Sequence, residues 1–278
     1  MKPIQRSSWR LAFGVAYYRM KRRVRWFFAR ANLARTRDGK PYPYLYFRHQ
    51  TPLLRKLKDV DMRLQHNKVH NLRLAVERLH GLVVQPGETF SYWRLIGKPT
   101  RRKGYREGMV LVQGRVGTGV GGGLCQLSNL IYWMTLHTPL TVTERHRHSY
   151  DVFPDANRTQ PFGSGATCFY NYLDLQIENR TAQPFQLNIW LTDTHLVGEW
   201  RSTQPASLHY EVYEKEHLIT PAIWGGYLRH NTLYRRIRDG SGTVVADEFV
   251  TENHAYMMYE PLLAAPGDGE TGKPDQRR

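Results

Sequence analysis

The stretch GRVGTGVGGGLCQLSNLIYWMTLHTPL, residues 114–140, decides how the middle of the chain folds. Six glycines fall within residues 114–123, and glycine lets a backbone adopt positive φ or approach a ligand closely. Apolar residues then recur at helical spacing until Pro139, which favours the end of a helix. The sequence therefore predicts a glycine-rich loop and a helix that starts near Cys125.

A cysteine at the start of a helix is a candidate nucleophile. The positive end of the helix dipole lowers the pKa of such a thiol, and exposed backbone amides nearby can bind an oxyanion. We expect the oxyanion- and substrate-binding residues to be Gly121, Gly122, Gly123, Gln126, Ser128 and Asn129. An inert, buried Cys125 explains the same local sequence. A phosphate-binding loop does not, because no lysine follows the glycines.

The second candidate motif follows the predicted helix. Residues 140–150 predict a strand, in which Glu144, His146 and His148 alternate along one face. The short connection at Pro139 should pack this strand beside the Cys125 helix, with a histidine about 3–4 Å from the thiol. Three alternatives stay open: a register slip that presents the arginines instead, a zinc site, and a solvated basic strand.

The remaining pattern places helices early and strands late. Residues 67–80 predict a helix, and residues 82–84 and 109–112 predict short strands. Later strand-like runs cover residues 166–178, 185–191, 195–200, 208–213, 233–238 and 243–250. We therefore predict an α+β fold, in which early helices, including the Cys125 helix, pack on a largely antiparallel sheet formed by the later strands.

Composition limits the class of protein. The 278 residues carry a formal net charge of +16, and 41% of them are hydrophobic, which excludes a wholly disordered chain. Two cysteines are too few for a disulfide scaffold, and we interpret Cys168 as structural. No apolar run is long enough for a transmembrane helix.

Residues 1–37 contain eleven Lys and Arg residues and no acidic residue. This segment is either a solvated, partly disordered leader or an arm that binds an anionic partner. Aromatic side chains between the cations favour a membrane interface, whereas no motif supports nucleic-acid binding. No signal peptide is apparent, so we expect a cytoplasmic protein or one peripheral at the inner face of the membrane.

The sequence also resembles the VanW family, from residue 40 to about residue 200. The motifs that carry the resemblance are Asn71–Ala75, Gly81–Trp93, Gly121–Asn129, Leu136–Thr141, Glu144–Arg145, His148 and Asp174–Asn179. Some larger relatives resemble peptidoglycan L,D-transpeptidases that use the motif cysteine. The resemblance implies that Cys125 is the nucleophile and His148 the favoured base, with His146 second. At Gly165 the chain departs from the family, which usually has Asp before Ala166 and Thr167.

Two hypotheses about function follow. The first is a cysteine-dependent acyl-transfer enzyme acting on peptidoglycan or its precursor peptide, with no metal and no cofactor. The second is a non-catalytic accessory module that binds wall precursor, glycopeptide or an anionic membrane. We predict a basic arm at 1–40, a VanW-like core at 41–200, a β-rich extension of that domain at 201–265 and a disordered tail at 266–278.

Overall fold

Helix α4 (Cys125–Leu136) forms where the apolar period predicts it and occupies the centre of the core. The computed structural model describes residues 7–54, 61–112, 114–152 and 160–261. Four apolar side chains of α4 are exposed by 1% or less: Leu127, Leu130, Ile131 and Met134. The helix packs against the main sheet, where Gly198 leaves room for it, because a Cβ there would lie 2.6 Å from Met134 Cε.

The main sheet has the strand order β1-β10-β9-β2 and is antiparallel throughout. Its strands are β1 (Tyr44–Pro52), β10 (His195–Ser202), β9 (Phe185–Leu191) and β2 (Leu82–Val84). The predicted strands at 82–84, 185–191 and 195–200 are thereby confirmed. Helix α2 (Met62–Val76) packs on β9 and on the neighbouring hairpin.

Two smaller sheets flank this core. One has the order β3-β8-β6, with β3 (Thr89–Ser91), β8 (Gln176–Glu178) and β6 (Thr141–Glu144). The other is the hairpin of β4 (Glu107–Val112) and β5 (Arg115–Val120). Much of the glycine-rich stretch is therefore strand β5 rather than loop, and only residues 121–124 form a turn before α4. Short helix α3 (Tyr92–Ile96) and the 3-10 turn η2 (Arg101–Lys103) lie between β3 and β4.

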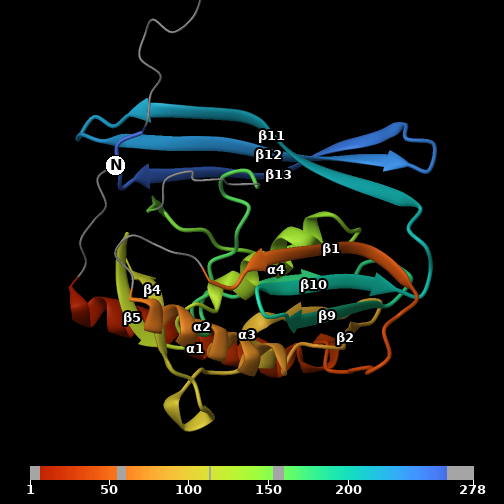
Figure 1. Ribbon diagram of the computed structural model, residues 1–278, viewed down its shortest axis with the longest axis horizontal. Coiled ribbons are helices and arrows are strands. Elements are labelled where there is room, and N and C mark those ends of the chain that lie inside the picture. The colour runs from red at the N-terminus through yellow and green to blue at the C-terminus, as the bar shows by residue number, and fades with distance from the viewer. Residues whose placement is uncertain (1–6, 55–60, 113, 153–159, 262–278) are drawn as a thin grey trace, which may run out of the picture.

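A separate sheet of long strands lies over α4, at the top of Figure 1. Its order is β11-β12-β13-β7, with β11 (Leu208–Pro221), β12 (Tyr227–Asp239), β13 (Val244–Met257) and β7 (Tyr150–Asp151). The late strands predicted from the sequence fall on these elements, which are longer than predicted. Four α-helices among the described residues, together with mostly antiparallel strands, confirm the α+β class.

The basic N-terminal segment is an ordered helix, α1 (Ser8–Phe28), followed by the 3-10 turn η1 (Arg30–Asn32). The expectation of a partly disordered leader is therefore wrong for the described residues of this segment. The reason is tertiary, since Arg19 and Arg22 reach into the core and Leu33 is buried beside Thr89. The predicted disordered tail at 266–278 lies outside the described residues.

Three predicted boundaries were wrong for local reasons. Helix α2 starts at residue 62 rather than 67, because the Asp61 side chain accepts a hydrogen bond from the amide of Arg63 and caps the helix. The strand predicted at 140–150 stops at Glu144 and resumes only at 150. The strand predicted at 166–178 is limited to 176–178, because Phe169 and Leu173 close a turn with two backbone hydrogen bonds.

The turn before α4 should tolerate no added side chain. A Cβ on Gly122 would lie 2.2 Å from the carbonyl of Gly108, which is backbone and cannot rotate away. We expect Gly122→Ala to lower the free energy of unfolding by about 2 kcal/mol or more in urea denaturation. Gly117→Ala is the matched control on the same hairpin, because its Cβ would make only an ordinary 3.9 Å contact with Val110. Equal stability of the two variants would contradict this packing argument.

Candidate functional site

Cys125 is the first residue of α4, directly after the glycine turn. Gly121 and Gly123 have φ of 80° and 90°, and positive φ at these two positions explains the glycines. Cys125 is half-buried as a residue, and its Sγ lies 4.0 Å from the carbonyl oxygen of Cys168. The hydroxyl of Tyr92 donates to the carbonyl of Leu124 and supports the turn from below.

The electrostatics of this thiol differ from the sequence prediction. Burial raises the pKa of Cys125, and hydrogen bonds with the backbone of Cys168 and of Cys125 itself offset that effect only in part. The direction is opposite to the predicted lowering of the pKa, because burial of the thiolate is the largest influence on this thiol. Burial also raises the pKa of Cys168, which is 6% exposed and packs in the hydrophobic core.

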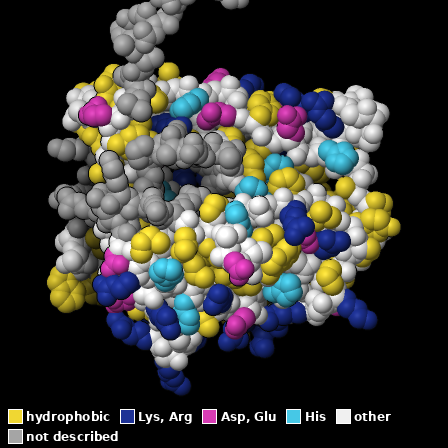
Figure 2. Space-filling model, viewed as in Figure 1, with side chains coloured by type: hydrophobic (Ala, Val, Ile, Leu, Met, Phe, Trp, Pro, Cys, Tyr) yellow, Lys and Arg dark blue, Asp and Glu magenta, His cyan; other side chains and the backbone are white. Residues whose placement is uncertain are grey.

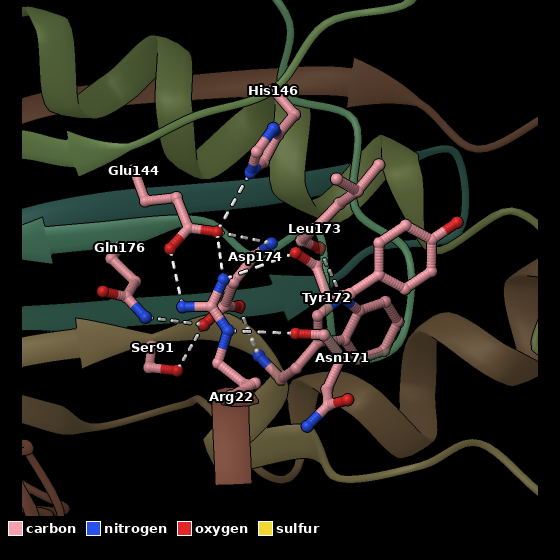
Figure 3. A network of polar contacts seen from close by, with 10 residues as sticks. Arg22, Ser91, Glu144, His146, Asn171, Tyr172, Leu173, Asp174 and Gln176 are labelled. Atoms are coloured by element: carbon pink, nitrogen blue, oxygen red, sulfur yellow. Dashed lines mark hydrogen bonds and ion pairs between the residues drawn. The ribbon is translucent and has the colours of Figure 1, made fainter. Parts of the chain in front are cut away.

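Glu144, at the end of β6, is the centre of a polar network (Figure 3). Its carboxylate accepts hydrogen bonds from His146 Nε2 at 3.0 Å, from the amide of Asp174 at 3.1 Å and from both terminal nitrogens of Arg22. Burial opposes ionisation of Glu144. The hydrogen bonds from His146 and Arg22, with the Arg22 charge, outweigh it and hold the pKa of Glu144 at about 2.

Arg22 comes from α1, 122 residues before Glu144 in the sequence. It is 7% exposed, and its guanidinium also donates to the carbonyls of Asn171 and Tyr172. Sequence reasoning missed this residue, because one arginine in a basic run looks like its solvated neighbours. Only its helical spacing from Val15, Arg19 and Trp26 indicates a common face.

Asp174 supports the network from the core side. The Asp174 side chain is fully buried and accepts hydrogen bonds from Ser91 Oγ, the Trp93 amide and Gln176 Nε2. Burial raises the pKa of Asp174 to about 6, although those hydrogen bonds favour the carboxylate. The carboxylate joins β3, α3 and β8, and thereby fixes the backbone whose amide reaches Glu144.

His146 and His148 lie in the irregular segment after β6, not on a regular strand. Only His146 contacts Glu144, and its backbone carbonyl accepts from the amide of Thr167 at 2.9 Å. His148 is half-buried, burial lowers its pKa, and it makes no hydrogen bond with another described residue. Neither histidine is hydrogen-bonded to Cys125 among the described residues.

The other predicted site residues are engaged in packing. Gln126 Nε2 donates to Thr51 Oγ1 and to the carbonyl of Pro52 on β1. Ser128 is buried and donates to the carbonyl of Ala166, whose amide donates to Asn129 Oδ1. Ser128 and Asn129 therefore hold the segment at Ala166 against the first turns of α4, and Gln126 ties α4 to β1.

Gly165 lies in the segment that packs on α4. A Cβ there would lie 2.7 Å from Asn129 Oδ1, so a side chain at this position would displace the amide that accepts a hydrogen bond from Ala166. The departure from the family pattern at Gly165 is thus accommodated by close packing, and no carboxylate takes part in the site at this position.

A cavity of about 600 Å³ opens between α4, the segment after β6 and β13. Its lining residues are Tyr132, Leu136, Val142, Thr143, Arg145, His146, Arg147, Leu173, Val250 and Thr251. Figure 2 shows this face of the molecule hollowed between the C-terminal sheet and the layer that contains α4. His146 therefore contacts both the buried Glu144 and an open space large enough for a ligand.

Arg145 gives the cavity a positive charge. Its guanidinium donates to the carbonyls of Gly163 and Gly165 and to Thr251 Oγ1, and it lies 5.0 Å from the ring of Tyr132. All of these partners are neutral, and no carboxylate forms an ion pair with Arg145 among the described residues. Within the same ranges, no three His, Cys, Asp or Glu side chains gather as metal ligands.

The structure defines an α+β domain in which Cys125, His146 and Glu144 lie on neighbouring segments. Comparison with known proteins identifies the family of this domain. Residues 67–201 match the family model described as "VanW like protein". The chain therefore contains a VanW-like region, which the family model matches over residues 67–201. The resemblance seen in the sequence is confirmed.

Two curated relatives share this region. The vancomycin B-type resistance protein VanW of Enterococcus faecalis is 38% identical over 177 residues, which cover 63% of this chain and 64% of that protein. The uncharacterized protein YoaR of Bacillus subtilis is 32% identical over 118 residues, 42% of this chain and 37% of that protein. The matches thus span less than two thirds of either relative, and no solved structure matches the chain.

The Arg22–Glu144 ion pair should make the free energy of unfolding depend on pH. The folded-state pKa of about 2 lies below the ordinary value of 4.5, so the pair stabilises the fold above about pH 4.5 and this contribution is lost as the pH falls towards 2. We expect Arg22→Gln to cost about 3 kcal/mol at pH 7 and to flatten urea-unfolding stability between pH 5 and 2. Arg180→Gln, at an exposed pair with Glu178, is the control. Parallel pH curves for Arg22→Gln and wild type would refute the assignment.

The thiol should titrate late. Because burial raises the pKa of Cys125, its alkylation by iodoacetamide in a Cys168→Ala background should be slow at pH 7 and still accelerate above the free-cysteine pKa of about 8.5. The rate is followed by mass spectrometry across the pH range. Rapid alkylation that is already maximal at pH 7 would show that the helix dipole dominates after all.

Proposed function

We propose that this protein, with its VanW-like region, is a cysteine-dependent acyl-transfer enzyme that acts on a peptide of the bacterial cell wall. The observation that carries the proposal is the contact between Glu144 and His146, because His146 also lines the cavity. A carboxylate that binds one ring nitrogen orients the imidazole and leaves the other nitrogen for proton transfer. Nε2 faces Glu144, so Nδ1 of His146 is the nitrogen that would accept the proton.

The backbone connects this histidine to the thiol. His146 is hydrogen-bonded to Thr167, and the next residue, Cys168, has its carbonyl 4.0 Å from Cys125 Sγ. Tyr132, seven residues after Cys125 on α4, lines the cavity together with His146. The same segment therefore contacts both the helix start and the base, which supports His146 over the His148 that the family resemblance favoured.

The chemistry of this proposal is acyl transfer through a thioester. The Cys125 thiol gives its proton to His146 while its sulfur adds to an amide carbonyl carbon. The C–N bond then breaks, and the departing amine takes that proton. An incoming amine attacks the thioester to form a new amide and releases the thiol, whereas water in its place gives hydrolysis. A thiol with a raised pKa needs such a base, since little thiolate exists beforehand.

Backbone amides at the start of α4 would stabilise the oxyanion. The amide of Gln126 already donates to the carbonyl of Gly123, so it is occupied in this state. The amides of Leu124 and Cys125 have no such backbone acceptor among the described residues, and they belong to the thiol's own residue and to the one before it. We therefore assign the oxyanion role to these two amides rather than to Gln126.

A second candidate function is non-catalytic binding of a wall precursor or glycopeptide, as an accessory to vancomycin resistance. The observation that favours it is the Arg145 charge, because Arg145 lines the cavity and its hydrogen-bond partners among the described residues are all neutral. A carboxylate at the end of a peptide would complement this charge. The name of the Enterococcus relative links that protein to vancomycin B-type resistance, and we extend the link to this chain as part of the proposal.

Turnover and binding separate the two candidates. We expect the protein to convert a peptidoglycan stem peptide, with the products detected by mass spectrometry, and Cys125→Ala to abolish turnover. His146→Gln should lower the rate by about 10²–10⁴-fold, the usual contribution of a general base, whereas His148→Gln and Cys168→Ala serve as controls near wild type.

Different results would overturn the role of His146 and the enzyme hypothesis itself. Loss of turnover in His148→Gln with normal turnover in His146→Gln would overturn the role of the Glu144–His146 pair. No turnover by wild type, together with equal calorimetric binding of the peptide by wild type and Cys125→Ala, would refute the enzyme and leave the binding module. In that case Thr143→Tyr, which fills the exposed edge of the cavity, should weaken binding.

A further inference from the structure

Helix α1 has one face that the core covers. Val15, Arg19, Arg22 and Trp26 point inward at spacings of four, three and four residues, and all are buried or half-buried. Arg19 Nε donates to the carbonyl of Tyr170 at 2.9 Å, next to the carbonyls that Arg22 holds. These contacts fix the rotation of the helix, and therefore determine which residues face away from the protein.

The opposite face is an apolar stripe. Phe13, Tyr17, Met20, Val24 and Phe27 recur at spacings of four and three and are 71%, 62%, 58%, 47% and 71% exposed. Trp9 and Phe28, 75% and 82% exposed, extend the stripe at both ends. Large apolar side chains in a continuous row are unusual at a solvated surface and mark an interaction site. We refer to these seven residues as the α1 stripe.

Cations border the α1 stripe. On the helical wheel Arg10, Lys21 and Arg25 lie along one edge and Arg23 along the other, and the helix contains no acidic residue. Long basic side chains beside buried aromatic rings suit a water–lipid boundary, where the charged ends reach the headgroups. A second copy of the same helix would bring these like charges together, so charge complementarity favours an anionic lipid surface as the occupant.

We propose that α1 lies in the interface of an anionic membrane, with the α1 stripe at the acyl boundary and the flanking cations on lipid phosphates. No helix among the described residues is long and apolar enough to span a bilayer. In Figure 1, α1 lies on the side of the core away from the C-terminal sheet, so a membrane there leaves that sheet uncovered. The proposal depends on α1 alone and not on the chemistry proposed for Cys125.

Vesicle co-sedimentation of the full-length protein tests the docking. Wild type should bind phosphatidylcholine vesicles that contain phosphatidylglycerol, and only weakly those of phosphatidylcholine alone. Lys21→Ala/Arg25→Ala should reduce partition about thirtyfold, given the usual contribution of a basic residue at an anionic surface. Phe13→Ser/Tyr17→Ser/Phe27→Ser should abolish binding. Phe249→Ser, an aromatic 59% exposed on β13, is the matched control and should bind as wild type does.

Three results would overturn the proposal. One is equal binding of wild type to both kinds of vesicle, which removes the electrostatic argument. Another is unchanged binding by both α1 variants. The third is absence of vesicle binding together with a dimer in analytical ultracentrifugation that the triple variant dissociates, which would assign the α1 stripe to a second copy. Circular dichroism is the control for folding. We expect the variants to keep the fold, because the substituted side chains are exposed.

Discussion

The bidentate ion pair between Arg22 and Glu144 joins parts of the chain that no other contact of this kind brings together among the described residues. A guanidinium and a carboxylate, 7% and 17% exposed, cannot remain unpaired without a large desolvation cost. Each charged group is therefore stable in its place only when the other is present. The segments that donate to or accept from this pair are constrained as well. The remaining donors of Arg22 are satisfied by the carbonyls of Asn171 and Tyr172, so this loop must also take its observed course.

This constraint reaches the site through Glu144. The carboxylate cannot turn away from Arg22, so its contact with His146 Nε2 has a fixed direction. It also receives the amide of Asp174, whose own carboxylate is anchored to Ser91 and to the Trp93 amide. A histidine held on one side by a rigid carboxylate and open to a cavity on the other is pre-organised for proton transfer or for ligand binding.

Helix α1 takes part in both the proposed catalytic site and the proposed membrane contact, but neither proposal depends on the other. Its inward face supplies Arg22 to the carboxylate that orients His146, and its outward face carries the α1 stripe. A protein docked through this helix would present its cavity at a defined orientation to the membrane.

Sequence patterns alone determined the elements whose causes are local. The apolar period after Cys125 predicted α4 and its first residue, and β-rich runs predicted β9, β10 and the long C-terminal strands, because helix and strand periods reflect burial along one segment. The motif residues further identified the family. Tertiary structure alone decided the partner of Glu144, since Arg22 lies 122 residues away and looks like a solvated cation. It also decided the pKa direction of Cys125, because desolvation by the surrounding segments, which no local pattern encodes, raises that pKa.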